Sequence, residues 1–144
     1  MERDEAHFIE LLRVAVVDQH VRIAPEWARS PIKRMALLRR RADVSAERFA
    51  QEWLTTQATL LQAMPGVRGH RQNLVLARQA PKGTPVDHGG MPIDGIAELW
   101  FDDAEAMYDA FVSPAGREAT RHAQSFAAET TPFLVKRHVI VQRR

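Results

Sequence analysis

The order of apolar segments and helix signals along the chain restricts the fold more than any other feature. Four segments have the length and apolar content of strands: residues 32–39, 67–77, 94–101 and 133–141. Two stretches with helix-capping signals separate them, one after the first segment and one after the third. This pattern predicts the order strand, helix, strand, strand, helix, strand.

The first helix is predicted by signals at both of its ends. Ser45 is a good N-cap residue, and Glu47 places a negative charge in the first turn, where the helix dipole favours it. Pro65 and Gly66 then end the helix. We therefore expect a helix over residues 46–64.

The second helical stretch is predicted in two parts. Asp102 and Glu105 have the spacing of a capping box, which starts a helix. Ser113 and Pro114 end this helix and begin another, because proline is favoured at the first helical position. We expect residues 130–132, which end in a proline, to interrupt the regular secondary structure before the last strand.

This order of elements is that of the ferredoxin-like split βαβ fold, an α+β architecture. It predicts one four-stranded antiparallel sheet with the helices on one face. We expect residues 31–141 to form this domain and residues 1–30 to form an N-terminal arm that packs on the domain or on a partner subunit. Within the arm, Val14, Val16 and Val17 have the character of a strand or of a buried segment.

Both faces of the predicted sheet carry large apolar side chains. Strand side chains alternate between faces, so Leu99 and Phe101 share one face while Ile96 and Trp100 share the other. A sheet open to water on one side would show a cleaner polar alternation. A second copy of the sheet is the simplest cover, and two facing sheets would form a dimeric α/β barrel around an apolar cavity. The alternative is that the N-terminal arm covers this face and no pocket exists.

The composition limits the classes of function. The chain of 144 residues contains no cysteine, which excludes disulfides, thiolate metal sites and a cysteine nucleophile. Its net charge is only +2, which argues against the dense basic face that nucleic acids require. No apolar run exceeds four residues, and the first residues are not the basic start of a signal peptide. We expect a cytoplasmic protein that binds neither nucleic acid nor a membrane.

Three sequence motifs follow one another along the chain. They are Phe49-x3-Trp53-x3-Gln57, then Met64-Pro65-Gly66-Val67, and then Asp94-Gly95-Ile96-Ala97-Glu98-Leu99-Trp100-Phe101. Together they resemble the EthD family, and the resemblance covers roughly residues 31–141. It implies a dimeric α/β barrel, and therefore a homodimer, in agreement with the order of elements.

The resemblance leaves the reaction open. Relatives on the same fold include lactone isomerases, polyketide cyclases and dehydratases, and haem-degrading or quinone-forming monooxygenases, so the fold does not decide the chemistry. The family usually has histidine where this chain has Gln57. Histidine can act as an acid or base near neutral pH, whereas a glutamine amide only forms hydrogen bonds. The replacement of histidine by Gln57 makes a binding function more strongly favoured in this chain than in a standard member of the family.

Three titratable residues are candidates for catalysis: His70, Glu98 and His138. If they face one cavity, they could form an acid–base group. The structural alternatives are a hydrogen-bonded strand histidine and a carboxylate that is ion-paired, with Arg34 as a candidate partner, rather than raised in pKa. The histidines lack close ligand spacing, so we expect no metal site, and we expect no cofactor.

Four residues are candidates for binding the substrate: Gln57, Trp53, Arg34 and Trp100. Gln57 lies with Trp53 on the apolar stripe of the first helix, where it either orients a ligand or serves as a structural amide. Trp100 either stacks on a planar ligand or belongs to the core.

Two functions are consistent with these residues. The first is a small cofactor-free enzyme that isomerises, cyclises, dehydrates or oxygenates an apolar or aromatic organic molecule in catabolism or secondary metabolism. The second is a non-catalytic binding or accessory protein that uses the same cavity.

Overall fold

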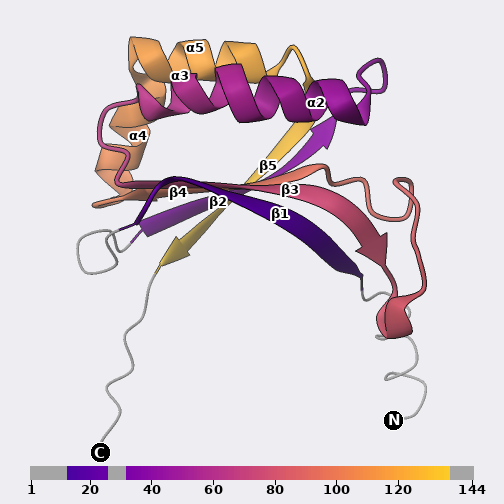
Figure 1. The fold of residues 1–144 in the computed structure, drawn as a ribbon. Helices are drawn as coiled ribbons and strands as arrows, with labels where there is room; N and C mark the ends of the chain where they lie inside the picture. Colours follow the sequence, from indigo (N-terminus) through magenta and orange to yellow (C-terminus); the bar gives the residue numbers. More distant parts are fainter. Residues whose placement is uncertain (1–12, 26–31, 137–144) are drawn as a thin grey trace, which may run out of the picture.

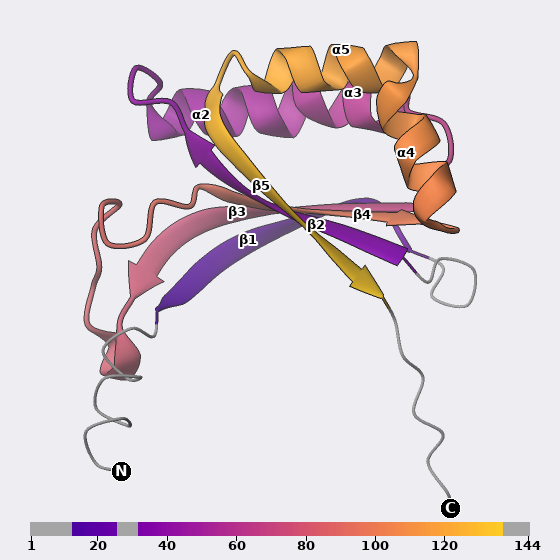
Figure 2. The same ribbon diagram turned by 180° about the vertical axis from the view of Figure 1, so that it is seen from behind.

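The computed structural model describes residues 13–25 and 32–136 of the chain. Its strands form one antiparallel sheet in the order β1-β3-β4-β2-β5. The strands are β1 (Val14–Ile23), β2 (Ile32–Arg40), β3 (Gly69–Gln79), β4 (Gly95–Phe101) and β5 (Ala127–Lys136). The helices α2 to α5 lie on one face of this sheet, and a short 3₁₀ turn (Pro81–Gly83) lies beyond the end of β3 (Figures 1 and 2). The ferredoxin-like α+β arrangement predicted from the order of elements is confirmed.

The helices begin where the sequence places caps. A long helix comprises α2 (Ala46–Glu52), a π-helical turn (Trp53–Gln57) and α3 (Ala58–Gln62), and it is followed later in the chain by α4 (Ala104–Val112) and α5 (Pro114–Ala123). The Ser45 hydroxyl accepts a hydrogen bond from the backbone N–H of Arg48. Asp103 rather than Asp102 caps α4, and Ser113 caps α5 with Pro114 at its first position. These side chains satisfy N–H groups that have no partner within the helix.

The expectation of a four-stranded sheet is wrong, because β1 adds a fifth strand. β1 pairs with β3 along its whole length, from Val14 opposite Gln79 to Ile23 opposite His70. The edge of β3 would otherwise expose a row of unpaired backbone groups, and β1 satisfies them. This part of the expected arm therefore extends the sheet at its edge instead of lying across its open face (Figure 1). Residues 1–12 and 26–30 of the arm lie outside the described residues.

The last strand begins earlier than the sequence predicted. β5 starts at Ala127, and Pro132 lies inside it, opposite Ala36 of β2. The predicted break at residues 130–132 is therefore wrong. β5 is an edge strand of the sheet, where a proline without an N–H group is tolerated. The end of the predicted strand, with His138, lies outside the described residues.

Aromatic side chains fill much of the space between the sheet and the long helix. Phe49 and Phe126 are buried, with ring centroids 5.5 Å apart, and Phe49 and Trp53 are separated by the same distance. The Trp53 ring lies directly on Gly95 of β4, where an added Cβ would come within 2.6 Å of it. The tryptophan of the Phe-x3-Trp motif and the glycine of the β4 motif therefore pack against each other.

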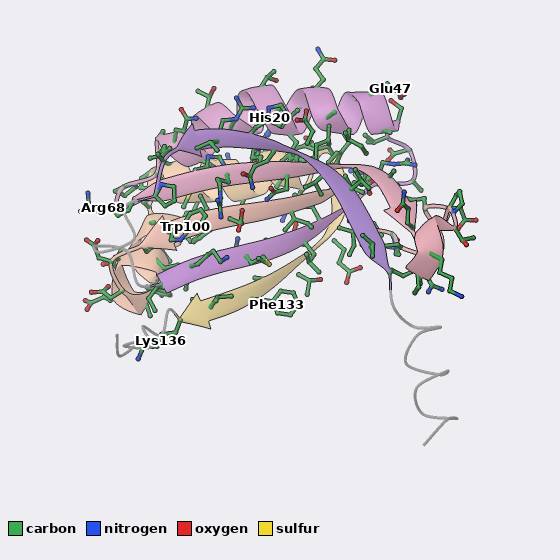
Figure 3. The ribbon with its side chains drawn as sticks, turned by 60° about the horizontal axis from the view of Figure 1, so that its bottom comes forward. His20, Glu47, Arg68, Trp100, Phe133 and Lys136 are labelled. Carbon is green, nitrogen blue, oxygen red and sulfur yellow. The ribbon has the colours of Figure 1, made fainter. Side chains whose placement is uncertain are left out.

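The opposite face of the sheet has no helix among the described residues. Figure 3 shows this face, with Trp100 and Phe133 on it and the helices behind. Large apolar side chains are exposed on both edge strands of this face: Val16, Val17 and Val21 of β1, and Phe133 and Val135 of β5.

We predict that Gly95→Ala destabilises the fold by about 1–3 kcal/mol, because the new methyl group overlaps the ring of Trp53. Urea unfolding measures the change in the free energy of unfolding. Gly89→Ala is the matched control, since its nearest neighbouring atom would be 3.6 Å from the new Cβ. Equal stabilities of the two variants would contradict the close contact.

Candidate functional site

A cavity of about 330 Å³ lies between the sheet and the helices. Its floor is formed by Arg34, Ala36 and Leu38 of β2 with Ala97 and Leu99 of β4, and its other walls include Trp53, Gln57, Leu61, Phe111, Ala119, Thr120 and Ala123. The sequence interpretation placed a cavity between two facing sheets, whereas this one lies within a single chain on the helix side. Alanines at several lining positions leave the space that larger side chains would fill.

Arg34 supplies the cation of the cavity. It lies on the helix-facing side of β2, between Leu99 of β4 and Leu134 of β5 in the register of the sheet. Its Cζ atom is 4.4 Å from the centroid of the Phe111 ring, which is the geometry of a cation–π contact. Burial lowers the pKa of Arg34 below its ordinary value, but an arginine remains protonated in proteins. The cavity therefore contains a partly desolvated positive charge.

Gln57 is held in the cavity wall by two hydrogen bonds. Its Nε2 donates to the carbonyl oxygen of Ala119 at 3.1 Å, so its Oε1 faces the Nδ1 of His122 at 2.7 Å. Since an amide oxygen only accepts, Nδ1 of His122 carries a proton. Gln57 lies at the end of the π-helical turn, a distortion that is frequent at functional sites. The second N–H of its amide has no partner in these two bonds.

His122 connects Gln57 to a carboxylate. The imidazole Nε2 is 3.1 Å from Oε2 of Glu52, and the ring packs edge-on against Phe126. His122 therefore contacts Gln57 through one ring nitrogen and Glu52 through the other. His122 does not line the cavity. It lies behind Gln57 and sets the orientation of the amide.

Glu98 lies on the opposite face of the sheet from the cavity. Its carboxylate is 3.2 Å from Nζ of Lys33 and 3.1 Å from Nε of Arg71, and it accepts a hydrogen bond from Asn73. Burial raises the pKa of Glu98, but the hydrogen bonds from Asn73 and Arg71 and the charge of Arg71 outweigh it and lower the pKa below its ordinary value. Glu98 is therefore an ion-paired carboxylate, and its partners are Lys33 and Arg71 rather than Arg34.

Trp100 belongs to the same cluster as Glu98. It is buried, and its ring lies 4.7 Å from the guanidinium carbon of Arg71 and 5.6 Å from the ammonium of Lys33. The ring therefore packs against the cations that pair with Glu98, on the helix-free face of the sheet. It does not line the cavity.

His70 is fully buried on β3. Neither of its ring nitrogens has a hydrogen-bond partner within the part of the chain that the structure describes. Burial, and secondarily the charge of Arg22, lowers the pKa of His70 to about 4, so the ring is neutral at pH 7. His70 does not line the cavity either.

The structure thus brings together three of the predicted site residues. Arg34, Trp53 and Gln57 line one cavity, whereas His70, Glu98 and Trp100 lie elsewhere, and His138 is outside the described residues. The sequence interpretation missed Phe111 and Ala119 as lining residues. Ala119 and Ala123 are spaced four residues apart on α5, so they lie on one face of the helix. This face of small side chains is the sequence feature that could have indicated the cavity.

Within residues 13–25 and 32–136, no group of three His, Asp or Glu side chains gathers in a way that could hold a metal ion. None of the helices in those same ranges combines the length and apolar character that crossing a membrane requires.

The sequence of residues 41–130 matches the family model of the EthD domain. No curated protein matches the chain. A solved structure of an ethyl tert-butyl ether D (EthD) family protein from Bacillus halodurans is similar, with 21% identity, a TM-score of 0.60, and coverage of 74% of this chain and 98% of that one.

Two further solved structures have the same fold. A dimeric ferredoxin-like protein of unknown function from Thermobifida fusca has 16% identity and a TM-score of 0.56, and the match covers 73% of this chain and 89% of that one. SnoaB, a cofactor-independent oxygenase from Streptomyces nogalater, has 10% identity and a TM-score of 0.52, with coverage of 79% and 99%. At these identities the similarity establishes the fold and not the reaction.

We predict that His70 makes the protein less stable as the pH falls from about 6.5 to about 4. In that range the unfolded chain binds a proton at residue 70 and the folded chain does not, so protonation favours unfolding. At ~1.4 kcal/mol per pKa unit, the loss reaches about 3 kcal/mol near pH 4.

Urea unfolding of wild type and of His70→Leu across this pH range checks this. The variant has no imidazole to titrate, so its free energy of unfolding should fall less steeply with acid. Parallel curves for the two proteins would show that the burial of His70 does not govern its protonation.

Proposed function

The chain belongs to the EthD domain family, and from this membership we propose that it binds a small apolar or aromatic organic molecule in the cavity between its sheet and its helices. The observation that carries this proposal is the cavity itself. Its volume, about 330 Å³, lies in the range of small-molecule pockets. Its walls combine apolar side chains with a small number of polar groups, which is typical of sites that bind such molecules.

The polar groups of the cavity are suited to orienting a bound molecule. Arg34 and the free amide N–H of Gln57 are both donors, so an acceptor on the ligand would pair with them. Trp53 and Phe111 provide aromatic surface for a planar body. The ligand would therefore bind in one preferred orientation.

The second candidate function is catalysis without a cofactor. The specific observation that favours it is the chain of contacts from Gln57 through His122 to Glu52, which places an imidazole and a carboxylate one amide away from the cavity. The catalytic roles expected of His70 and Glu98 lack this support, since neither lines the cavity. Binding is the better-supported function for this reason.

A second copy of the chain is the partner we propose for the helix-free face of the sheet. The apolar residues exposed on β1 and β5 would be buried against the same residues of the copy, which would give the dimeric α/β barrel. The dimeric protein of the same fold supports this arrangement. A cytoplasmic location and a role in catabolism or secondary metabolism stay predictions from the sequence.

We predict that naphthalene binds in the cavity, and that Ala123→Leu weakens this binding about tenfold or more because the larger side chain occupies the cavity wall. The quenching of tryptophan fluorescence measures binding, since Trp53 lines the cavity. Ala104→Leu, at an exposed position on α4, is the matched control and should bind like wild type.

Unchanged binding in Ala123→Leu would contradict the location of the site. Chromatography of a panel of lactones and phenols after incubation with the protein separates the two candidate functions. Full recovery of the compounds supports binding alone, and conversion supports the enzyme.

We predict that the protein is a dimer with twice the 16.3 kDa mass of one chain, and that Phe133→Glu shifts it to a monomer. Phe133 is 49% exposed on the helix-free face, and a buried carboxylate there would have no partner to offset its desolvation. Light scattering measures the mass. Tyr108→Glu, on α4 of the helix layer, is the control that should remain dimeric, and a monomeric wild type would contradict the proposal.

A further inference from the structure

Arg34 is unlike the other arginines of the sheet. Every other arginine on the described strands has a partner: Arg22 with Gln72 and the Leu54 carbonyl, Arg39 with Glu129, Arg40 and Arg78 with Asp94, and Arg71 with Glu98. Arg34 has only the face of the Phe111 ring, and no carboxylate of the described residues lies within ion-pair distance of it. Among the arginines of the described strands, Arg34 is therefore the one whose side chain has no hydrogen bond or ion pair.

The Arg34 side chain faces the cavity rather than the outer surface of the protein. Arg34 lines the cavity together with apolar neighbours on the same floor, Ala36 and Leu99. Burial in the cavity lowers the pKa of Arg34, because its charge is less well solvated there than in water. A partly buried charge without a counter-ion is costly unless another group neutralises it.

The one carboxylate among the lining residues cannot neutralise Arg34. Glu129 is paired with Arg39 at 3.2 Å, and it lies opposite Arg39 in the register of β2 and β5. Arg39 is five residues along β2 from Arg34, which corresponds to about 16 Å at ~3.3 Å per residue. No carboxylate of the described residues is therefore placed to act as the counter-ion of Arg34.

We infer that the molecule bound in the cavity carries a carboxylate on an aromatic body, and that this carboxylate pairs with the guanidinium of Arg34. This inference rests on the proposed binding function and names the class of ligand. The planar fork of a guanidinium matches the two oxygens of a carboxylate, so the pair can form two parallel hydrogen bonds. In the low-dielectric cavity such a pair is stronger than the same pair in water.

The remaining contacts of the cavity suit the same ligand. The free amide N–H of Gln57 is a second donor, which suits an oxygen acceptor and disfavours a cationic ligand. Trp53 and the alanines of α5 leave apolar space beyond Arg34 for the aromatic rings. Arg34 would thus select the acid over a neutral molecule of the same shape.

The test compares two probes that share their rings, 2-naphthoate and its neutral methyl ester, by calorimetry at pH 7.5. We expect wild type to bind the acid about tenfold more tightly than the ester, a ratio that Arg34→Gln abolishes. Arg48→Gln, at an exposed position on α2, is the matched control and should keep the ratio.

Each other outcome has a distinct meaning. If wild type binds the acid and the ester equally, the inference about the carboxylate is overturned and the proposed binding function stands. If Arg34→Gln keeps the preference for the acid, another residue recognises it and the inference is overturned. If neither probe binds, both are overturned. The wild-type comparison alone decides the matter if Arg34→Gln fails to fold.

Discussion

The contact between Trp53 and Gly95 sets the spacing of the two layers on which the rest of the structure depends. Because Gly95 has no side chain, the indole ring lies directly on the backbone of β4 and brings the long helix close to the sheet at that point. Farther along the same interface, the facing residues include Ala36, Ala97 and Ala119, whose methyl groups are too short to fill the space that the ring spans. A tightly packed region and a hollow region therefore follow from the same pair of layers, and the hollow is the cavity.

The amide at position 57 changes what the cavity wall can do. Gln57 holds its amide between the Ala119 carbonyl and His122, so the amide lines the cavity and the imidazole lies behind it. The chain thus keeps a histidine and a carboxylate close to the site, but the group that a ligand meets is a neutral donor. Recognition of an acceptor is the direct consequence, and any proton transfer would have to pass through or around the amide.

Local signals in the sequence were sufficient for much of the fold. The caps at Ser45 and Ser113 and the proline at 114 mark the helix starts because they act on the adjacent N–H groups, and the alternation of Leu99 and Trp100 correctly separates the two faces of β4. The fifth strand was not predictable in this way, since β1 is a strand through its pairing with the distant β3. The side on which the cavity lies depended equally on non-local contacts. Periodicity separates two faces but does not say which one the helices cover, so Arg34 and Glu98 could be named as candidates without being assigned to opposite sides.

Two neighbouring cations on β2 show how strand geometry separates structure from recognition. Lys33 and Arg34 are adjacent in the sequence and therefore point to opposite faces of the sheet. Lys33 forms an ion pair with Glu98, which also contacts Arg71 and Asn73. The charges of this network are therefore paired within the chain. Arg34 faces a cavity lined by alanines and by the rings of Trp53 and Phe111, and its charge has no counter-ion among the described residues. A shift of one residue in the register of β2 would exchange these roles, so the parity of the strand decides which charge stabilises the sheet and which is available to a ligand.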